Sequence, residues 1–476
     1  MRSPAALLLL LVPLLRLGGG GDACLRISKA GTQVQGDVKI CPGRYRFPDG
    51  GEHGVIIIAS SLTRLDLTGV TLESGDSVPS RYVGIGVFAR GVDRVEIVGG
   101  TIRGYRFGVR IEGGRGHRVS GMDLSGSRTQ ALRSTPEKFD EADWLDIFHP
   151  DTFETYGGGL LLKFTDAASI TGITARNSQN GIGLVGARGS YVADNDVSFN
   201  SGWGIHLYQS VQNVIVRNQA HHNVRCESAS YSQGCDSAGL LLRERSDSNL
   251  VADNNLTYSG DGFFLSGQRG EVQPSIGNLV LRNDASFSPH NAFESTFSAW
   301  NEFLDNRADS SGYGFWLGYS TGNTVRGNTI VGSRAIAIAI EHGSDNEIAS
   351  NVIIGGRRGI YLFIRDTAGQ ASNNYRVHDN TIARVDQGLV LEHTTQTRVR
   401  GNLFDGVGEA LVADRAGAGT EVSGNIFLRA DRLYIRAPVL DAGKNYWGAG
   451  DEAATRSHVE GDINLTPWKP ASAAGY

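Results

Sequence analysis

The chain has 476 residues, a formal net charge of -5 and 20% charged residues, so it lacks the strongly basic surface that nucleic-acid binding requires. Its 64 glycines supply the backbone freedom for many tight turns, and its 12 prolines are few enough to leave strand ladders intact. Length alone would allow three domains, so the periodicity of the chain has to decide the domain organisation.

The N-terminal segment has the pattern of an export signal. Arg2 precedes an apolar run over 5–15, which is too short to span a bilayer as a mature helix. A glycine-rich stretch follows, and cleavage near Ala23 is expected, so that residues 1–23 form a signal peptide. We therefore expect a secreted or periplasmic protein with no membrane insertion after cleavage.

The four cysteines form two closely spaced pairs. Cys24 and Cys41 lie at the start of the mature domain, and Cys226 and Cys235 flank a loop insertion over 225–236. Two local disulfides, one within each pair, are the simplest pairing in an oxidising compartment. The spacings do not match a zinc site, and we expect neither a metal nor a cofactor.

The largest insertion covers residues 127–157 and separates two coils of the repeat described below. Thr135 as a helix cap, Pro136 in the first turn and early acidic residues predict a short helix that leads into 138–148. This helix would be the main departure from an otherwise all-β chain.

The same insertion carries large apolar side chains. Trp144, Phe148 and Phe153 are too apolar to remain in water, so we expect the insertion to fold back onto the rest of the protein. With the loops at 225–236 and 268–277 it would form the walls of a groove, since long loops in repeat proteins often carry function. A plain capping role remains the alternative.

An asparagine recurs along the second half of the chain at nearly fixed intervals. Six of the nine spacings are 22 or 23 residues, and the longer spacings of 36 and 29 fit one repeat plus a loop insertion. A Gly or Ala followed by alternating apolar residues keeps the same period, as in Gly204-Ile-His-Leu-Tyr208 and Gly314-Phe-Trp-Leu-Gly318. The asparagines of this series are Asn195, Asn218, Asn254, Asn283, Asn306, Asn328, Asn351, Asn380, Asn402 and Asn425.

Short alternating strands at such a period predict a solenoid in which each repeat forms one coil. Each strand would pair in parallel with the same strand of the next coil, and the asparagines would stack as an inward ladder. The repeat region has room for roughly 14 coils. We expect an all-β parallel β-helix over 55–450, with an N-terminal cap over 24–54 and a C-terminal tail over 451–476.

Aligning the strands on their Gly or Ala residues separates an inward from an outward face. The first and third residues after the Gly are apolar and face the core, so the second and fourth residues face outward, about 4.8 Å apart from coil to coil. Ser, Thr, Asn and Lys are typical of an ordinary solvent-exposed face. Seven successive coils instead carry His206, Tyr208, Arg243, Phe264, Glu294, Trp316, Glu341 and Tyr361 outward.

This outward stripe predicts a groove that binds a poly- or oligosaccharide to a monomeric protein. Aromatic rings stack on the apolar faces of pyranose rings, and charged groups bond hydroxyls or carry out acid/base chemistry. The alternative is that the aromatic residues pack under a covering loop and the charges form a solvated surface. The expected binding residues are Lys163, Phe264, Trp316, Tyr361, His290 and Glu244.

Carboxylates on the stripe form the first candidate catalytic set. Glu294 and Glu341 lie two coils apart, with Cα atoms on the order of 11–12 Å apart, which is compatible with the carboxyl separation of an inverting glycosidase. Asp261 and His290 precede their strands at the same edge, and Asp236 at the end of the disulfide loop points toward the same region. The set predicts a glycoside hydrolase with Glu294, Glu341 and Asp261 as catalytic residues.

A second candidate set overlaps the first. His206, Tyr208 and Arg243 lie on adjacent coils, within side-chain reach of one another. A base beside an arginine that neutralises a uronate carboxyl suits removal of the C5 proton, as in a polysaccharide lyase or a uronate C5-epimerase. The alternative is that His206 and Tyr208 only bond sugar hydroxyls.

The repeat from Gly204 to Asn218, Gly-Ile-His-Leu-Tyr-Gln-Ser-Val-Gln-Asn-Val-Ile-Val-Arg-Asn, resembles those of pectate-lyase-like proteins, alginate epimerases and NosD-like periplasmic proteins. Asn445-Tyr446-Trp447-Gly448 resembles a C-terminal cap common in such chains. The resemblance implies a right-handed parallel β-helix, a fold that many functions share. It leaves open a carbohydrate-active enzyme, a NosD-like accessory protein for metal-centre maturation, and a glycan-binding protein without catalysis.

Overall fold

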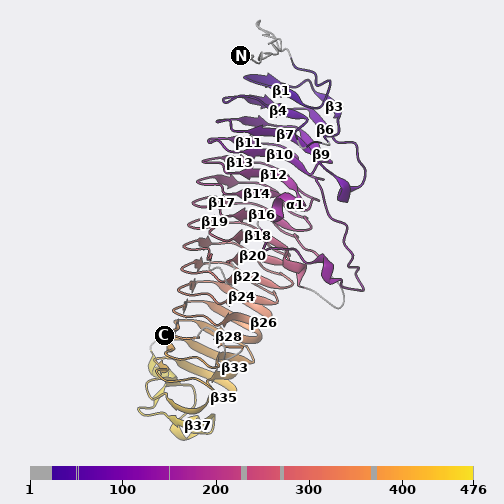
Figure 1. Cartoon of the computed structure of the whole chain (residues 1–476). Helices are drawn as coiled ribbons and strands as arrows, with labels where there is room; N and C mark the ends of the chain where they lie inside the picture. The colour runs from indigo at the N-terminus through magenta and orange to yellow at the C-terminus, as the bar shows by residue number, and fades with distance from the viewer. Residues whose placement is uncertain are drawn as a thin grey trace, which may run out of the picture.

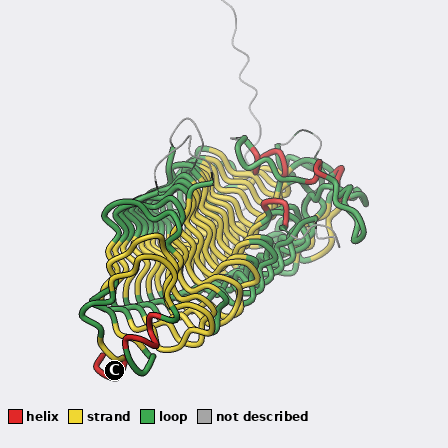
Figure 2. The backbone as a smooth tube through the Cα atoms, turned by 90° about the horizontal axis from the view of Figure 1, so that it is seen from below, coloured by secondary structure: helices red, strands yellow, loops and turns green. Residues whose placement is uncertain are grey.

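The computed structural model describes residues 24–49, 51, 53–149, 151–226, 233–267, 273–365 and 372–474. The expected signal peptide lies outside these residues. The described chain folds as a right-handed parallel β-helix, an elongated stack of coils with the two ends of the chain at opposite ends of the stack (Figure 1). Seen along this stack, the strands of successive coils lie in register over one another (Figure 2).

Two long parallel sheets run along the solenoid, and a short third sheet covers its first coils. The first sheet comprises β1 (Thr32–Val34), β4 (Ile56–Ile58), β7 (Ile85–Arg90), β10 (Phe107–Glu112), β12 (Gly158–Lys163), β14 (Ile182–Val185), β16 (Trp203–Tyr208), β18 (Ala238–Arg243), β20 (Asp261–Ser266), β22 (Asn291–Thr296), β24 (Tyr313–Gly318), β26 (Thr329–Glu341), β28 (Val352–Phe363), β30 (Thr381–Ala383), β31 (Gln387–Leu391), β33 (Leu403–Val412), β35 (Ile426–Asp441), β36 (Tyr446–Trp447), β37 (Val459–Asn464) and β38 (Lys469–Pro470). The second comprises β2 (Asp37–Lys39), β5 (Arg64–Asp66), β8 (Glu96–Val98), β11 (Arg118–Ser120), β13 (Ser169–Thr171), β15 (Tyr191–Ala193), β17 (Val214–Val216), β19 (Leu250–Ala252), β21 (Leu279–Leu281), β23 (Glu302–Leu304), β25 (Thr324–Arg326), β27 (Glu347–Ala349), β29 (Arg376–His378), β32 (Arg398–Arg400) and β34 (Glu421–Ser423). The third comprises β3 (Gly43–Arg46), β6 (Val70–Glu73) and β9 (Thr101–Arg103).

The second sheet contributes one strand to each coil, and its 15 strands agree with the roughly 14 coils predicted from the repeat. Parallel pairing also reaches past the expected limits of the β-helix. β1 pairs with β4 at the N-terminal end, and β37 pairs with β35 at the C-terminal end. The segments expected as cap and tail therefore add strands to the first sheet.

The strand register matches the alignment on Gly and Ala residues. His206 pairs with Leu241 on the next coil, and Glu294 pairs with Phe264 on one side and Trp316 on the other. The alternate residues, such as Ile205 and Leu207, are fully buried in one continuous core that runs along the solenoid. The predicted division into inward and outward positions is confirmed.

The predicted asparagine ladder is also confirmed. The side-chain amide of each asparagine from Asn195 to Asn425 donates to the side-chain oxygen of the next member, at 2.9 to 3.1 Å. The backbone N–H of each member donates to the same oxygen, as Asn283 does to Asn306 at 2.9 Å. A second ladder, from Asn213 through Asn249 to Asn346, follows the other corner of the coil and was not predicted. Both ladders satisfy backbone groups that each bend would otherwise bury unpaired.

The insertion at 127–157 is mostly irregular, and the helix predicted from Thr135 onward is wrong. The structure places a 3-10 turn at Glu141–Asp143 and the short helix α1 at Thr152–Tyr156. The carboxylate of Asp143 accepts the backbone N–H groups of Arg133 and Ser134, which holds the preceding chain in a turn. Side-chain bonds to the backbone compete with helix formation in this way.

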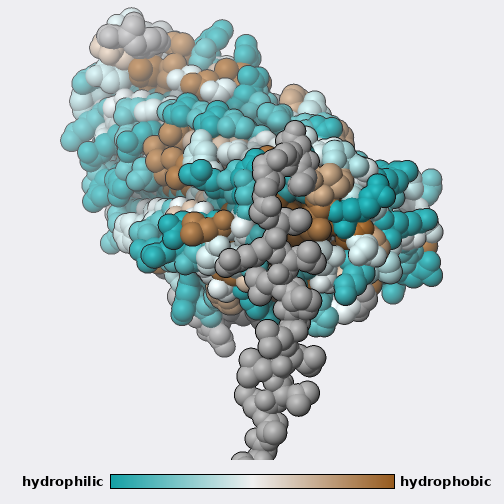
Figure 3. Space-filling model, turned by 90° about the horizontal axis from the view of Figure 1, so that it is seen from above, coloured by the Kyte–Doolittle hydropathy of each residue, from teal (hydrophilic) through white to brown (hydrophobic). Residues whose placement is uncertain are grey.

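The other short helices lie near the ends or in loops: α2 (Glu452–Arg456) and 3-10 turns at Pro79–Arg81, Gly234–Asp236 and Ala471–Ala474. In the face seen from the N-terminal end, hydrophilic residues cover most of the surface and apolar residues gather in separate patches (Figure 3). Apolar patches that are small and separate are normal for a protein surrounded by water.

Candidate functional site

Asp261, His290 and Glu294 form a cluster where β20 and β22 begin. One ligand atom from each residue, two carboxylate oxygens and a ring nitrogen, lies within 4.8 Å of the other two. Asp261 is fully buried, whereas His290 and Glu294 remain partly exposed. Asp236 completes what we call the acidic cluster, because its charge acts on His290 and Glu294.

Hydrogen bonds fix the side chains of the acidic cluster. Asp261 Oδ1 lies 3.0 Å from His290 Nδ1 and accepts the backbone N–H of Asn291 at 3.0 Å. The Asn291 side chain donates to Glu294 Oε2 at 2.5 Å. The second carboxylate oxygen of Asp261 and the side-chain oxygen of Asn291 are buried without a hydrogen-bond partner. Such atoms also occur elsewhere in the described residues, but here two of them lie within one cluster of titratable groups.

The disulfide loop brings Asp236 to the cluster. The structure contains both predicted disulfides, Cys24–Cys41 and Cys226–Cys235, and Asp236 directly follows the second. A Cβ on Gly234 would lie 2.4 Å from the Cα of Gly260, the residue before Asp261, so only glycine permits this close approach. Two segments far apart in the sequence are thereby held against each other at the start of β20.

The acidic cluster shifts the pKa of three of its members. Burial raises the pKa of Asp236 to about 7, with the Asp261 carboxylate as the second cause. Burial and then Asp261 hold the pKa of Glu294 well above its usual range. Burial alone would lower the pKa of His290, but Asp261 outweighs it and raises this pKa to about 9. At neutral pH the cluster therefore contains an imidazolium and an Asp236 that is near its own pKa, and the shift at Glu294 favours its protonated form.

Glu341, expected as the partner of Glu294, is not part of the cluster. The strand β24 lies between their two strands, and Glu341 is only 5% exposed. Its carboxylate instead faces Arg365, with an N–O distance of 3.3 Å. Pairing with a cation explains why Glu341 can be buried without a second acid beside it.

On the coils before the acidic cluster, aromatic residues of the outward stripe are packed under a loop, which was the alternative to an open groove. Phe153 of α1 belongs to one hydrophobic cluster with Leu161, Leu241 and Phe264, and Phe264 is only 3% exposed, so it cannot line an open groove. His206 lies under the same insertion, 5.6 Å from the Phe153 ring and 4.7 Å from the Trp203 ring. Burial, with a smaller effect from Arg243, holds the pKa of His206 well below its usual 6.5.

Other residues of the second candidate set bond to protein groups. Arg243 is 1% exposed and donates to the His149 carbonyl at 3.2 Å and to Glu244 at 3.0 Å. Its guanidinium also lies 5.0 Å from the ring of Tyr208, whose pKa is raised by burial and by Glu244. Lys163 pairs with Glu154 in α1. These contacts hold the insertion in place, and Arg243 is too buried to neutralise a uronate in a groove.

The outward stripe is accessible beyond the cluster. Trp316 is partly exposed on the strand next to Glu294, and the Tyr313 ring meets it edge to face at 5.0 Å. Tyr361 stacks on Phe363 at 4.1 Å, and burial and a bond to Glu392 raise its pKa to about 12. Of the expected platforms that are partly exposed, Trp316 is the one adjacent to the acidic cluster.

Asn291 is the residue of the site that the repeat pattern did not identify. It occupies the first position of β22, in register with Tyr313, and polar residues at this position are a departure from the pattern. The segment Ser288-Pro289-His290-Asn291 places His290 directly before the strand and Asn291 at its first position, and this polar pair could have marked the site.

Comparison with solved structures gave matches of low sequence identity. The A-module of the mannuronan C-5 epimerase AlgE6 of Azotobacter vinelandii is 13% identical, with a TM-score of 0.43, over 81% of this chain and 90% of that chain. The surface adhesin PfbA of Streptococcus pneumoniae is also 13% identical, with a TM-score of 0.42, over 84% of each chain. At this level of identity the likeness extends to the fold alone. Comparison with curated proteins gave no match.

A family model covers most of the chain. The NosD family, described as periplasmic copper-binding protein, matches residues 52–295 and 271–448. Two disulfides agree with that compartment, so the protein is secreted or periplasmic. Among the described residues, no helix is long and apolar enough to cross a bilayer. The chain belongs to the NosD family of right-handed parallel β-helix proteins.

Proposed function

We propose that the protein is a carbohydrate-active enzyme that hydrolyses a glycosidic bond at the acidic cluster. The observation that carries this proposal is the pair of partly exposed carboxyl groups, Glu294 and Asp236, whose pKa values are both raised. Titratable groups whose environments push their pKa values toward neutrality are typical of acid/base catalysis. Trp316 beside Glu294 supplies a ring on which a sugar can stack.

In this mechanism Glu294 is the general acid, because burial and Asp261 raise its pKa well above the usual range and so favour the protonated form. It donates that proton to the glycosidic oxygen as the bond to the anomeric carbon breaks. Asp236, partly ionised near pH 7, takes a proton from the water that attacks the anomeric carbon. One water is consumed, and the two products carry a new reducing end and a new hydroxyl group.

Asp261 and His290 have supporting roles. Asp261 is fully buried, so it positions His290 rather than touching substrate. His290 is cationic and partly exposed, and it can donate a hydrogen bond to a sugar oxygen. A buried carboxylate that orients a histidine is a recurring arrangement in hydrolytic sites.

A substrate screen tests the proposal. The purified protein is incubated with a panel of oligo- and polysaccharides, and both new reducing ends and the absorbance of unsaturated products are measured. Hydrolysis yields reducing ends without that absorbance, and Glu294→Gln abolishes them. Unsaturated products would replace hydrolysis by elimination, and no product from any saccharide would remove the enzymatic proposal.

The acidic cluster also favours a second function, binding of copper(II). The family description names copper, and one imidazole nitrogen with two carboxylate oxygens within 4.8 Å fits a divalent ion. The partnerless oxygen of buried Asp261 could serve as an additional ligand. Copper(I) prefers sulfur ligands, but all four cysteines are in disulfides and Met122 is buried in the core. A copper(II) ion bound here would be held for storage or transfer.

Titration calorimetry and electron paramagnetic resonance with copper(II) separate the two functions. Tight binding that is lost in His290→Ala, in a protein without activity on any saccharide, supports the copper function. Hydrolysis that is unchanged by a chelator supports the enzyme, because the acid/base mechanism uses only protons from the chain's own residues.

A further inference from the structure

The strand face is blocked on one side of the acidic cluster. The insertion at 127–157, here called the covering insertion, packs Phe153 and Leu145 against Leu161, Leu241 and Phe264 on the outward face of the first sheet. These side chains form a hydrophobic cluster separate from the core of the solenoid. A saccharide cannot follow the outward face across these coils, since side chains of the insertion already occupy it.

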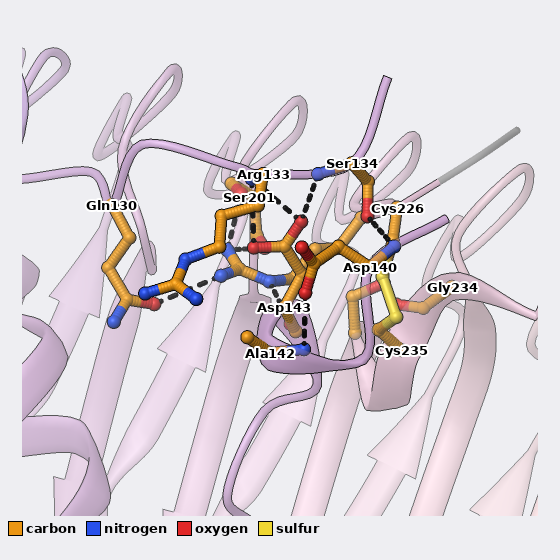
Figure 4. The surroundings of a disulfide bond; sticks show 12 residues. Gln130, Arg133, Ser134, Asp140, Ala142, Asp143, Ser201, Cys226, Gly234 and Cys235 are labelled. Carbon is orange, nitrogen blue, oxygen red and sulfur yellow. Dashed lines mark hydrogen bonds between the residues drawn. A yellow bond between two sulfur atoms is a disulfide. The ribbon is translucent and has the colours of Figure 1, made fainter. Parts of the chain in front are cut away.

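Buried polar contacts hold the covering insertion firmly. Arg225, only 3% exposed, donates to the Asp143 carbonyl at 2.6 Å, the Gln130 side chain at 3.1 Å and the Ser201 hydroxyl at 2.9 Å. Asp143 and its neighbours lie directly over the Cys226–Cys235 disulfide (Figure 4). Because opening would leave a buried guanidinium without these hydrogen bonds, this contact resists opening.

The covered region reaches the acidic cluster itself. The last covered residue, Phe264, is the direct strand neighbour of Glu294. Neighbouring strands lie about 4.8 Å apart, which is close to the length of one pyranose ring. The backbone N–H of Leu145 donates to the Cys235 carbonyl at 3.3 Å, so the insertion also contacts the loop that carries Asp236. The covered face therefore begins within one strand spacing of Glu294, too close for more than one sugar residue to extend past it.

The other side of the cluster is accessible along several coils. Trp316, Tyr361 and Arg358 are partly exposed on the next strands of the same face. A chain of sugar residues bound there would run away from Glu294 along the solenoid axis. The binding face is thus asymmetric about the catalytic residues.

We propose that the protein acts on the end of a saccharide chain and releases one sugar residue in each cleavage. The proposal rests on the hydrolytic function above and adds the mode of attack. The terminal residue lies between Glu294 and the covering insertion, and the remainder of the chain lies over Trp316. Each cleavage consumes one water and leaves a chain that is shorter by one residue.

The test uses the wild-type protein and linear hexasaccharides with a free reducing end, and the products are separated by chromatography and identified by mass. For the substrate that reacts, two further versions are prepared, one blocked by O-methylation at the non-reducing terminus and one reduced to the alditol at the other end. We expect monosaccharide and pentasaccharide as the first products, and loss of activity for one blocked version only. Early release of fragments from the middle of the chain, or equal activity on both blocked versions, would overturn the proposal while hydrolysis itself stands. No product from any hexasaccharide would overturn the hydrolytic function and this proposal with it.

A variant of Arg225, which anchors the covering insertion, tests whether this insertion is the reason that cleavage occurs at the chain end. Arg225→Met removes the contacts between the covering insertion and the disulfide loop, and Arg188→Met alters an exposed arginine on the same part of the solenoid. We expect fragments from the middle of the chain to appear with Arg225→Met and not with Arg188→Met. If Arg225→Met does not fold, the blocked hexasaccharides decide the question with the wild-type protein.

Discussion

The Nδ1 atom of His290 lies 3.0 Å from Oδ1 of Asp261, a carboxylate with no exposed surface. An ion pair of this kind on the surface would contribute little to stability, because solvent screens the two charges. Here the carboxylate is buried, so its attraction for the imidazolium outweighs the effect of burial on His290. The pair thereby keeps a positive charge beside Glu294 and Asp236 and moderates the repulsion between the carboxyl groups.

Replacing Asp261 by asparagine should lower the pKa of His290 from its value of about 9, because only Glu294 and Asp236 then oppose the effect of burial. An NMR titration of the imidazole measures this change directly. Asp194→Asn, which removes an exposed partner of Arg217, is the control and should leave His290 unchanged. An unaltered titration of His290 in Asp261→Asn would show that Asp261 does not determine its charge.

The same pair predicts a pH dependence of stability. The pKa of His290 is raised in the folded state, so its contribution to the free energy of unfolding is complete below about 6.5 and is lost as the pH rises through about 9. The difference in unfolding free energy between wild type and Asp261→Asn should therefore shrink over this interval. Denaturant titrations at several pH values test the prediction, and a constant difference would contradict it.

Glu294→Gln should reduce activity by roughly 10²–10⁴-fold, the usual contribution of a general acid, with little effect on binding. Glu341→Gln, the matched change at the other glutamate of the stripe, should leave activity nearly intact, because Glu341 pairs with Arg365 outside the cluster. Trp316→Ala should weaken binding instead, since a stacking ring serves ground state and transition state alike. Equal losses in both glutamine variants would restore the two-glutamate mechanism.

The repeat pattern was sufficient to predict the coils, the strand register and the asparagine ladder, because each depends on residues a fixed distance apart. It also placed Glu294, Asp261 and His290 at one edge of the sheet. It could not show that Glu341 would pair with Arg365, since side-chain partners depend on rotamers and not on register.

The position of the covering insertion depends on long-range packing that no local pattern encodes. The composition of the insertion indicated that it folds back, and Phe153 does so, whereas Trp144 and Phe148 remain 37% and 54% exposed. Phe153 covers the region of His206, so a residue that the pattern placed in a groove is buried. Sequence reasoning correctly found the outward face but could not tell its covered part from its open part.

His206 should make the protein less stable as the pH falls. Its pKa is lowered in the folded state, so below about 6.5 the unfolded chain binds a proton that the folded chain does not, and the free energy of unfolding decreases. Arg243, Phe153 and Trp203 surround the ring and offer no hydrogen-bond acceptor to the imidazolium. Relative to wild type, His206→Phe should gain stability as the pH is lowered from 7 to 5, measured by thermal unfolding. A stability difference between His206→Phe and wild type that does not change with pH would refute this role of His206.

Loss of either disulfide should lower stability, but only loss of Cys226–Cys235 should also lower activity. Each closes a short loop, of 17 and 9 residues, and loss of either should cost about 3 kcal/mol by the chain-entropy relation. Replacing Cys226 and Cys235 by serine should in addition lower activity, because Asp236 directly follows that disulfide. Replacing Cys24 and Cys41 by serine serves as the control for stability alone. Peptide mapping without reductant verifies the pairing, and equal activity in the two double variants would separate Asp236 from catalysis.

Substitution of an asparagine in the middle of the ladder should lower the free energy of unfolding. The side-chain oxygen of Asn306 accepts the backbone N–H of Asn283 at 2.9 Å and its amide at 3.1 Å, and the Asn306 amide donates to the Val280 carbonyl at 2.9 Å. Truncation in Asn306→Ala leaves these groups buried without partners, and each such group costs about 1–3 kcal/mol. We expect a loss of at least about 2 kcal/mol in denaturant unfolding. Glu302→Ala, on the exposed face of the same coil, should stay within about 0.5 kcal/mol of wild type. Comparable losses for the two variants would mean that the ladder adds no stability beyond that of an exposed strand residue.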